Sequence, residues 1–422
     1  MSNSENLTCD GSKARKKNFT MLFLTILVPF GLGHFISYLF RTINTVIYGD
    51  LSHDLSLPAS SLGLMTSIYF LTFAAAQLPL GVLLDRYGPR AVQSPMLFIA
   101  AIGSLVFATA QSELGLLVGR GLIGLGVAGS LMSAIKACSI WLPLERLPLS
   151  TACLLAVGGL GAMASTTPLH QLVSIFDWRE AFFMLAGLTA AASIIIYFSV
   201  TGHYPKKKTR LVDMSREVAR LYGSWSFWRL VVYSVFAHAT YMAILSLWMG
   251  PWLRDMGGLD VASMADVLMY GTVAMVAGSL SFGSLADFLR RYGVQPLMIC
   301  GCGITMFVAI QILMISGLDI SPYLLVAGFA FFGTSTTMNY AIVAQSVSPD
   351  LAGRVSSSFN LVVFVLAFVV QWVVGIVIGQ WQSVDGHYPI VAYQWSMGCL
   401  IVLQVPGLLL WLTFKPWRIK GK

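Results

Sequence analysis

Long runs of apolar residues, separated by short polar turns, follow one another along the whole chain. The apolar residues within each run are continuous and do not alternate with polar ones. Runs of about 20 such residues are typical of helices that cross a bilayer, and not of barrel strands. The pattern predicts about twelve helices, several of them long enough to tilt or protrude. Their expected ranges are 20–48, 60–84, 92–110, 114–141, 148–175, 180–201, 227–252, 263–286, 294–316, 321–346, 354–380 and 391–414.

The basic residues show which ends of these helices lie on the same side. If the amino terminus is cytoplasmic, 21 of the 26 Lys and Arg residues fall in segments on that side. The opposite loops hold only Arg179 and Arg254, and Arg41, Arg120 and Lys136 lie within helices. This asymmetry follows the positive-inside rule, so both termini are predicted to be cytoplasmic.

Composition excludes a soluble globule. Of the 422 residues, 57% are hydrophobic and only 10% are charged, whereas about 25% are charged in soluble domains. The first apolar run is too long for the roughly 7–15-residue core of a cleaved signal peptide, so we expect an uncleaved first helix. The net charge of +8 is explained by topology, and no nucleic-acid partner is expected.

No cofactor or metal is expected either. The six cysteines lack the spacing of disulfide frameworks or zinc sites. No nucleotide-binding P-loop appears, so ATP is not the predicted energy source.

The turns divide the chain into two six-helix halves. The predicted parts are a cytoplasmic tail (1–19), an N-terminal bundle (20–201), a basic cytoplasmic linker (202–226), a C-terminal bundle (227–414) and a second cytoplasmic tail (415–422). The linker is either a solvated connection along the inner leaflet or a regulatory, partner-binding segment.

One charged turn occurs twice, about half a chain apart. Each copy reads Gly-x-x-x-Asp followed by Arg-Tyr-Gly, and each ends a long apolar run on the predicted cytoplasmic side. Such repetition between membrane segments indicates two homologous halves and favours a transporter. The first copy comprises Gly81, Asp85, Arg86, Gly88 and Arg90, and the second comprises Gly283, Asp287, Arg290 and Arg291.

These motifs resemble those of the major facilitator superfamily, and the resemblance covers nearly the whole chain. The repeated turn matches the family's motif between helices 2 and 3. Arg120, followed by Gly124 and Gly126, is similar to the motif that opens helix 4. The resemblance implies an all-α membrane fold of twelve helices in two pseudo-symmetric halves. The Gly-Pro pair that drug/proton antiporters carry in helix 5 is absent from 156–164, which weakens the drug-exporter interpretation.

The resemblance also implies a role for the repeated turn. Glycine allows a neighbouring helix to approach closely, and the aspartate can cap a helix or pair with an arginine. A charged cluster of this kind would hold the inner helix ends together and stabilise the outward-open state. The alternative is a loop that only keeps positive charge inside. A surface ion pair contributes only about 0–1 kcal/mol, so a gate needs several contacts.

Arg41 is the most informative cation, because the sequence places no acidic residue in a helix core. An unpaired cation in hydrocarbon costs at least ~2.5–3.5 kcal/mol. His34, Tyr38, Arg41 and Thr45 lie on one face of the first helix. This polar face either lines a cavity, or Arg41 reaches to the outer surface.

The other candidates have equally open interpretations. Arg120 either contacts solute or ties helices together through backbone carbonyls. Lys136 lies about 160° around the same helix from Arg120, and either contacts solute or reaches the inner surface. In the second half, polar residues of the helices at 227–252 and 321–346 either line the central cavity that the resemblance implies or bond between helices. The candidate solute contacts are Arg41, His34, Tyr38, Arg120, Lys136, His238, Tyr241 and Asn339.

The predicted function is alternating-access transport of a small anionic or zwitterionic organic solute across the inner or plasma membrane, with uptake preferred. Arginine suits carboxylate and phosphate recognition. The sequence leaves three forms of coupling open: a coupling ion such as a proton, with histidine as its carrier; exchange for a counter-anion; or facilitated diffusion. The protein is expected to be a monomer. Alternatives are efflux of an amphipathic metabolite or drug, a polytopic membrane enzyme, and a transporter-like sensor.

Overall fold

The computed structural model describes residues 25–142, 147–199, 219, 221–347, 349–384 and 386–413. The predicted tails (1–19 and 415–422) and most of the predicted linker (202–226) lie outside these residues.

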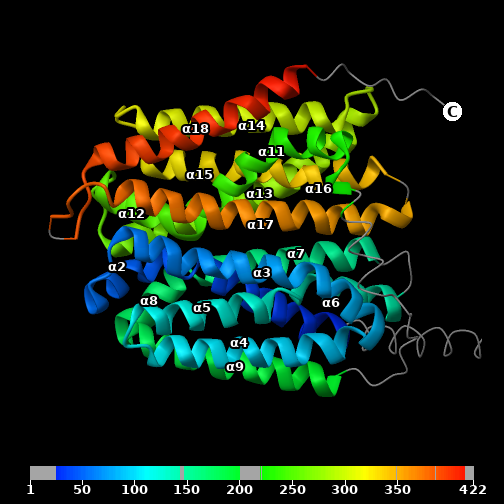
Figure 1. Cartoon of the computed structure of the whole chain (residues 1–422), viewed down its shortest axis with the longest axis horizontal. Helices are drawn as coiled ribbons and strands as arrows, with labels where there is room; N and C mark the ends of the chain where they lie inside the picture. Colours follow the sequence, from blue (N-terminus) through cyan, green and yellow to red (C-terminus); the bar gives the residue numbers. More distant parts are fainter. Residues whose placement is uncertain are drawn as a thin grey trace, which may run out of the picture.

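The described residues are almost entirely helical, as the apolar pattern predicts (Figure 1). In the first half the helices are Thr25–Thr42, α2 (Asn44–Leu55), α3 (Ala59–Tyr87), α4 (Pro89–Thr109), α5 (Glu113–Val127), α6 (Ser130–Trp141), α7 (Leu147–Ala164), α8 (Thr167–Ile175) and α9 (Trp178–Ser199). In the second half they are α11 (Trp225–Ala243), the π-helix η2 (Ile244–Trp248), α12 (Met249–Asp255), α13 (Val261–Arg290), α14 (Pro296–Ile315), α15 (Pro322–Gly333), the 3₁₀-helix η3 (Thr334–Thr337), α16 (Met338–Gln345), α17 (Pro349–Ile378) and α18 (Ile390–Leu412).

Nine helices of the described part are long and apolar enough to cross a membrane, and eleven result if each of two bent pairs forms one span. The protein is therefore an integral multi-pass membrane protein. The predicted span 321–346 is divided into α15, η3 and α16 and is not among the eleven. A count of twelve spans remains a prediction.

Hydroxyl side chains mark the places where spans break. The first span bends by 49° between Thr42 and Asn44, and Thr42 Oγ1 donates to the Tyr38 carbonyl within the last turn before the bend. The predicted span 148–175 bends by 42° between α7 and α8, where Ser165 and Thr166 donate to carbonyls three residues back. The carbonyls of Ala162 and Met163 also accept the backbone N–H groups of Ser165 and Thr166, so the hydroxyls add second bonds of a kind that often accompanies a bend.

The two halves form two bundles whose helices run along the same long axis (Figure 1). At their interface α3 of the first bundle packs along α17 of the second, and α13 contacts both α7 and α8. Near one end, α2 contacts η2 and α12. The space between the bundles is therefore bounded by broken or bent elements from both halves.

Close helix contacts depend on glycine at several positions. At Gly161 of α7, a β-carbon would overlap the carbonyl oxygen of Phe35 in the first helix. At Gly187 of α9, a β-carbon would meet nothing within 4 Å.

We expect the substitution Gly161→Ala to lower the free energy of unfolding by about 1–3 kcal/mol, because backbone atoms must shift to admit the methyl group. Thermal unfolding of purified protein in detergent measures this. The matched control is Gly187→Ala, which adds the same methyl group where there is space and should leave stability equal or slightly higher. Equal melting temperatures for both variants would contradict the packing described here.

Candidate functional site

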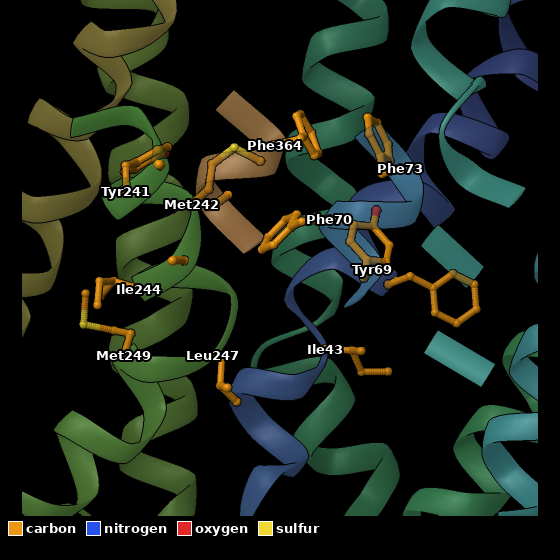
Figure 2. Close-up of a cluster of buried hydrophobic side chains, with 14 of the residues drawn as sticks. Ile43, Tyr69, Phe70, Phe73, Tyr241, Met242, Ile244, Leu247, Met249 and Phe364 are labelled. Atoms are coloured by element: carbon orange, nitrogen blue, oxygen red, sulfur yellow. The ribbon is translucent and has the colours of Figure 1, made fainter. Parts of the chain in front are cut away.

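Arg41 lies at the interface between the two bundles, one residue before the last residue of its helix. The guanidinium carbon lies 4.5 Å from the centre of the Tyr38 ring, 5.4 Å from Phe364 and 5.6 Å from Phe73. Phe73 of α3 and Phe364 of α17 stack with their centres 4.2 Å apart (Figure 2). Aromatic rings from both halves therefore surround the cation. Cation–π attraction stabilises the charge at such a position.

No described carboxylate forms an ion pair with Arg41. Its Nε atom is buried without a hydrogen-bond partner. The charge is thus held by rings and by neighbouring tyrosines rather than by an acid. This arrangement leaves donor capacity free at the centre of the molecule.

The polar face predicted on the first helix packs against α7 of the same bundle and η2 of the other bundle. The His34 ring is 3% exposed, stands edge-on to Tyr38 at 5.0 Å, and packs against Gly158 of α7. Thr45, after the bend, donates to the Leu245 carbonyl in η2 at 2.9 Å, and so reaches the other bundle.

The second bundle contributes His238 and Tyr241 from α11. Both are buried, and the Nδ1 atom of His238 and the hydroxyl of Tyr241 lack a hydrogen-bond partner. Figure 2 shows Tyr241 on one side of the interface and Tyr69 and Phe73 on the other, with Phe364 between them. His238 and Tyr241 both lie within electrostatic range of Arg41.

Tyr340 and Asn360 join this group. Tyr340 belongs to the polar residues predicted to face the cavity from the span 321–346, whereas Asn360 was not among the predicted solute contacts. The Tyr340 ring stands edge-on to His238 at 5.8 Å, and its hydroxyl donates to Asn360 Oδ1 at 2.5 Å. In the sequence, Tyr340 and Asn360 could be recognised as polar side chains within apolar runs. Phe73 and Phe364 could not be recognised as site residues, because an aromatic residue in such a run resembles any packing residue.

Three sequence candidates are engaged elsewhere. No acidic partner for Lys136 could be identified from the sequence, but the structure provides one: its Nζ lies 2.9 Å from Asp85 Oδ1, because α6 approaches the end of α3. Arg120 is fully buried and donates to the Phe40 carbonyl at 2.8 Å, which ties α5 to the first helix. The Asn339 amide accepts from Tyr233 at 2.7 Å and donates to the Leu230 carbonyl at 2.9 Å.

A small cavity of about 40 Å³ lies one helical turn beyond Arg41, between the bundles. Its polar lining consists of hydroxyl groups, and its other wall comes from η2 and α13. This volume is enough for ordered water, which needs about 10–15 Å³. The hydroxyl residues that line it are Thr42, Thr45, Ser165, Thr166 and Thr272.

The two copies of the charged turn share a backbone conformation but not their contacts. Gly88 and Gly293 have φ values of 83° and 80°, which favour glycine. The first copy is engaged in the Asp85–Lys136 pair. In the second copy, the close helix approach expected at Gly283 is absent, since nothing lies within 4 Å of its β-carbon position, and the Asp287 side chain is exposed.

The arginines of the two charged turns differ in the same way: those of the first copy have ring contacts, and those of the second copy are exposed. Arg90 lies over the Tyr197 ring of α9 at 4.8 Å, and Arg86 lies over its neighbour Tyr87 at 5.2 Å. In the second copy, Arg290 and Arg291 are both exposed. The described contacts therefore do not join the two copies into one cluster.

The opposite end of the interface is closed by hydrogen bonds that cross between bundles. Thr167 of α8 donates to Asp266 of α13 at 2.9 Å. The backbone N–H of Ala59, at the start of α3, donates to the Tyr388 hydroxyl at 3.0 Å.

A buried carboxylate organises the second bundle's side of this closure. Asp255, whose side chain is not exposed, pairs with Arg254 at 2.6 Å and His387 at 2.9 Å. It also accepts from the Tyr388 backbone at 3.0 Å and from the Tyr393 hydroxyl at 2.6 Å. The network thus fixes the backbone that carries the Tyr388 hydroxyl opposite α3.

Comparison with known proteins places these features in a family context. Residues 30–371 match the Major Facilitator Superfamily. A probable sulfoacetate transporter of Cupriavidus necator is 24% identical over 276 residues, which cover 62% of this chain and 64% of that protein. A probable L-galactonate transporter of Escherichia coli is 22% identical over 405 residues, or 89% of this chain and 87% of that one.

The fold has a solved counterpart. The inward-facing, unoccupied structure of a bacterial homologue of the human lysosomal transporter Spinster superposes with a TM-score of 0.71 at 16% identity, covering 92% of this chain and 96% of that one. This likeness shows the fold.

The Asp85–Lys136 contact makes a measurable prediction. In a double-mutant cycle on thermal unfolding, Asp85→Asn and Lys136→Met should show a coupling energy of about 0.2–1 kcal/mol, the range for partly exposed pairs. The charge-swapped variant, with Asp85→Lys and Lys136→Asp, should recover stability that either single reversal loses. Strictly additive effects and no recovery would contradict a direct pair.

Proposed function

This chain belongs to the major facilitator superfamily and is a transporter rather than an enzyme, and on that premise we propose that it carries a small anionic or zwitterionic organic solute into the cell by alternating access. The observation that carries the proposal is Arg41, a cation between the bundles with no described acidic partner.

The surroundings of Arg41 favour an anion over other solutes. A guanidinium presents forked donors that match carboxylate, sulfonate or phosphate oxygens. Rings from both bundles exclude water around it, and an anion would therefore meet a strengthened electrostatic attraction. The bound charge would also offset the cost of an unpaired cation in an apolar interior.

Alternating access requires that the interface open at one end at a time. The described hydrogen bonds between the bundles lie at the end opposite the charged turns, and the loop charges predict that this end is extracytoplasmic. We therefore assign the structure to a state with its outer gate closed. Solute would be released toward the cytoplasm from this state.

The direction proposed is uptake. Helix α7 lacks the Gly-Pro pair of drug/proton antiporters. The sequence places no carboxylate in a helix core to carry protons, so exchange against a second anion is the preferred form of coupling.

Arg41 provides the decisive test. Arg41→Ala should reduce solute counterflow in vesicles by at least about tenfold, since the anion loses its charged partner. Arg41→Lys should retain part of it, because the charge remains while the forked geometry is lost. The solute is first identified by thermal-shift screening of organic acids, amino acids and phosphorylated compounds. Wild-type rates for both correctly inserted variants would remove Arg41 from the site.

The outer closure has its own test. Tyr388→Phe removes the hydroxyl that accepts from Ala59 across the interface, and should raise the outward-open population about 2- to 10-fold, as expected for one hydrogen bond. Distances between spin labels on the two bundles report this. Tyr222→Phe is the matched control, since its hydroxyl donates to the Ser358 carbonyl within the second bundle and takes no part in the Asp255 network. An equal shift in both variants would mean that the cross-bundle bond does not hold the gate.

A further inference from the structure

Four buried side chains around Arg41 leave hydrogen-bonding capacity unused. They are the two ring nitrogens of His34, Nδ1 of His238, the Tyr241 hydroxyl and Nε of Arg41 itself. The His34, His238 and Tyr241 side chains are all more than nine-tenths buried, at 3%, 5% and 7% exposure. Buried polar atoms without partners destabilise a protein unless something satisfies them.

These atoms form one group rather than separate defects. His34 and Arg41 lie on the first helix, whereas His238 and Tyr241 lie on α11 of the other bundle. Each of the other three interacts electrostatically with Arg41. The unused groups therefore converge from both halves on the place where the anion is proposed to bind.

The chemistry of these groups is more specific than a positive charge. A neutral imidazole has one donor and one acceptor nitrogen, and a phenol can donate and accept. A hydroxyl pairs with both kinds of atom, because it also donates and accepts, and it is small enough to occur several times on one organic anion. An alkyl chain at the same position would leave the nitrogens unpaired.

We propose that His34 and His238 are specificity-determining residues that hydrogen-bond a hydroxylated portion of the solute from opposite bundles, while Arg41 holds its anionic end. The inference rests on the proposed function and deepens it: the solute is an organic anion that carries hydroxyl groups. Because one histidine belongs to each bundle, such a solute connects the two halves through its own hydrogen bonds.

The first experiment needs no ligand. In purified wild-type protein both ring nitrogens of His34 are unpaired and destabilise the fold, so His34→Leu should leave the melting temperature unchanged or raise it. His238 also has a hydrogen bond to the Thr336 backbone, so His238→Leu is used only in the binding experiment. Asn339→Leu is the control, because both groups of that amide have protein partners, and it should lower the melting temperature. If the melting temperature of His34→Leu falls as far as that of the control, the His34 nitrogens have structural partners or fixed water, and the proposal is overturned.

The second experiment compares anions that differ only in hydroxyl groups. The probes are glycerate against propanoate, tartrate against succinate, and isethionate against ethanesulfonate, with binding measured by calorimetry on the full chain. Wild-type protein should prefer the hydroxylated member of any pair it binds. His34→Leu or His238→Leu should weaken that member roughly 5- to 100-fold and leave the other nearly unchanged. A purely structural role would weaken both members alike.

The outcomes separate this inference from the proposed function. Binding that disappears in Arg41→Ala but shows no preference for hydroxyl groups, or a preference that survives both histidine variants, overturns the inference and leaves the anion site standing. Binding of no anion by the wild type contradicts the proposed function and this inference with it.

Discussion

The absence of water in the bilayer governs this structure, because every backbone carbonyl and N–H within the span needs a partner from the protein. Continuous helices meet this requirement unaided, and a break is tolerated where other bonds take over. At the α7–α8 break the backbone N–H groups of Ser165 and Thr166 bond to carbonyls three residues back, and hydroxyls such as those of Thr42 and Thr166 add second bonds at the bends. In η3, Thr336 and Thr337 donate to carbonyls three residues back. The breaks thus occur where serine and threonine are concentrated, and they border the space between the bundles.

The same constraint separates structural charges from functional ones. Arg120 donates a hydrogen bond to the Phe40 carbonyl, Lys136 forms an ion pair with Asp85, and Arg254 forms an ion pair with Asp255. Each of these cations has a polar partner that accounts for its position. Arg41 has a hydrogen bond with Tyr69 and aromatic rings from both bundles around it, but no described acidic partner. An apolar residue at that position would avoid the cost of the charge, so a solute that arrives and leaves gives the better account of it.

The sequence was sufficient for properties that depend on one segment at a time. Apolar runs located the helices to within a few residues, and the repeated turn located Gly88 and Gly293, whose positive φ follows from local geometry. Contacts between segments could not be predicted from the sequence. The Lys136 partner depends on how α6 lies against α3, and the Phe73–Phe364 stack exists only because α3 meets α17. Asn339 looked available because a single sequence does not show that Tyr233 and Leu230 flank it.

The two ends of the bundle interface differ in their cross-bundle hydrogen bonds, as a protein that opens at one end at a time requires. At the charged turns the described pair is internal to one bundle, so it does not oppose separation of the halves. At the other end three hydrogen bonds cross between bundles. At about 0.5–1.5 kcal/mol each they contribute roughly 1.5–4.5 kcal/mol. A ligand that binds one state 10²–10³-fold more tightly shifts an equilibrium by about 3–4 kcal/mol. The closure is therefore strong enough to define a state, and weak enough for a solute bound at the proposed Arg41 site to reverse it.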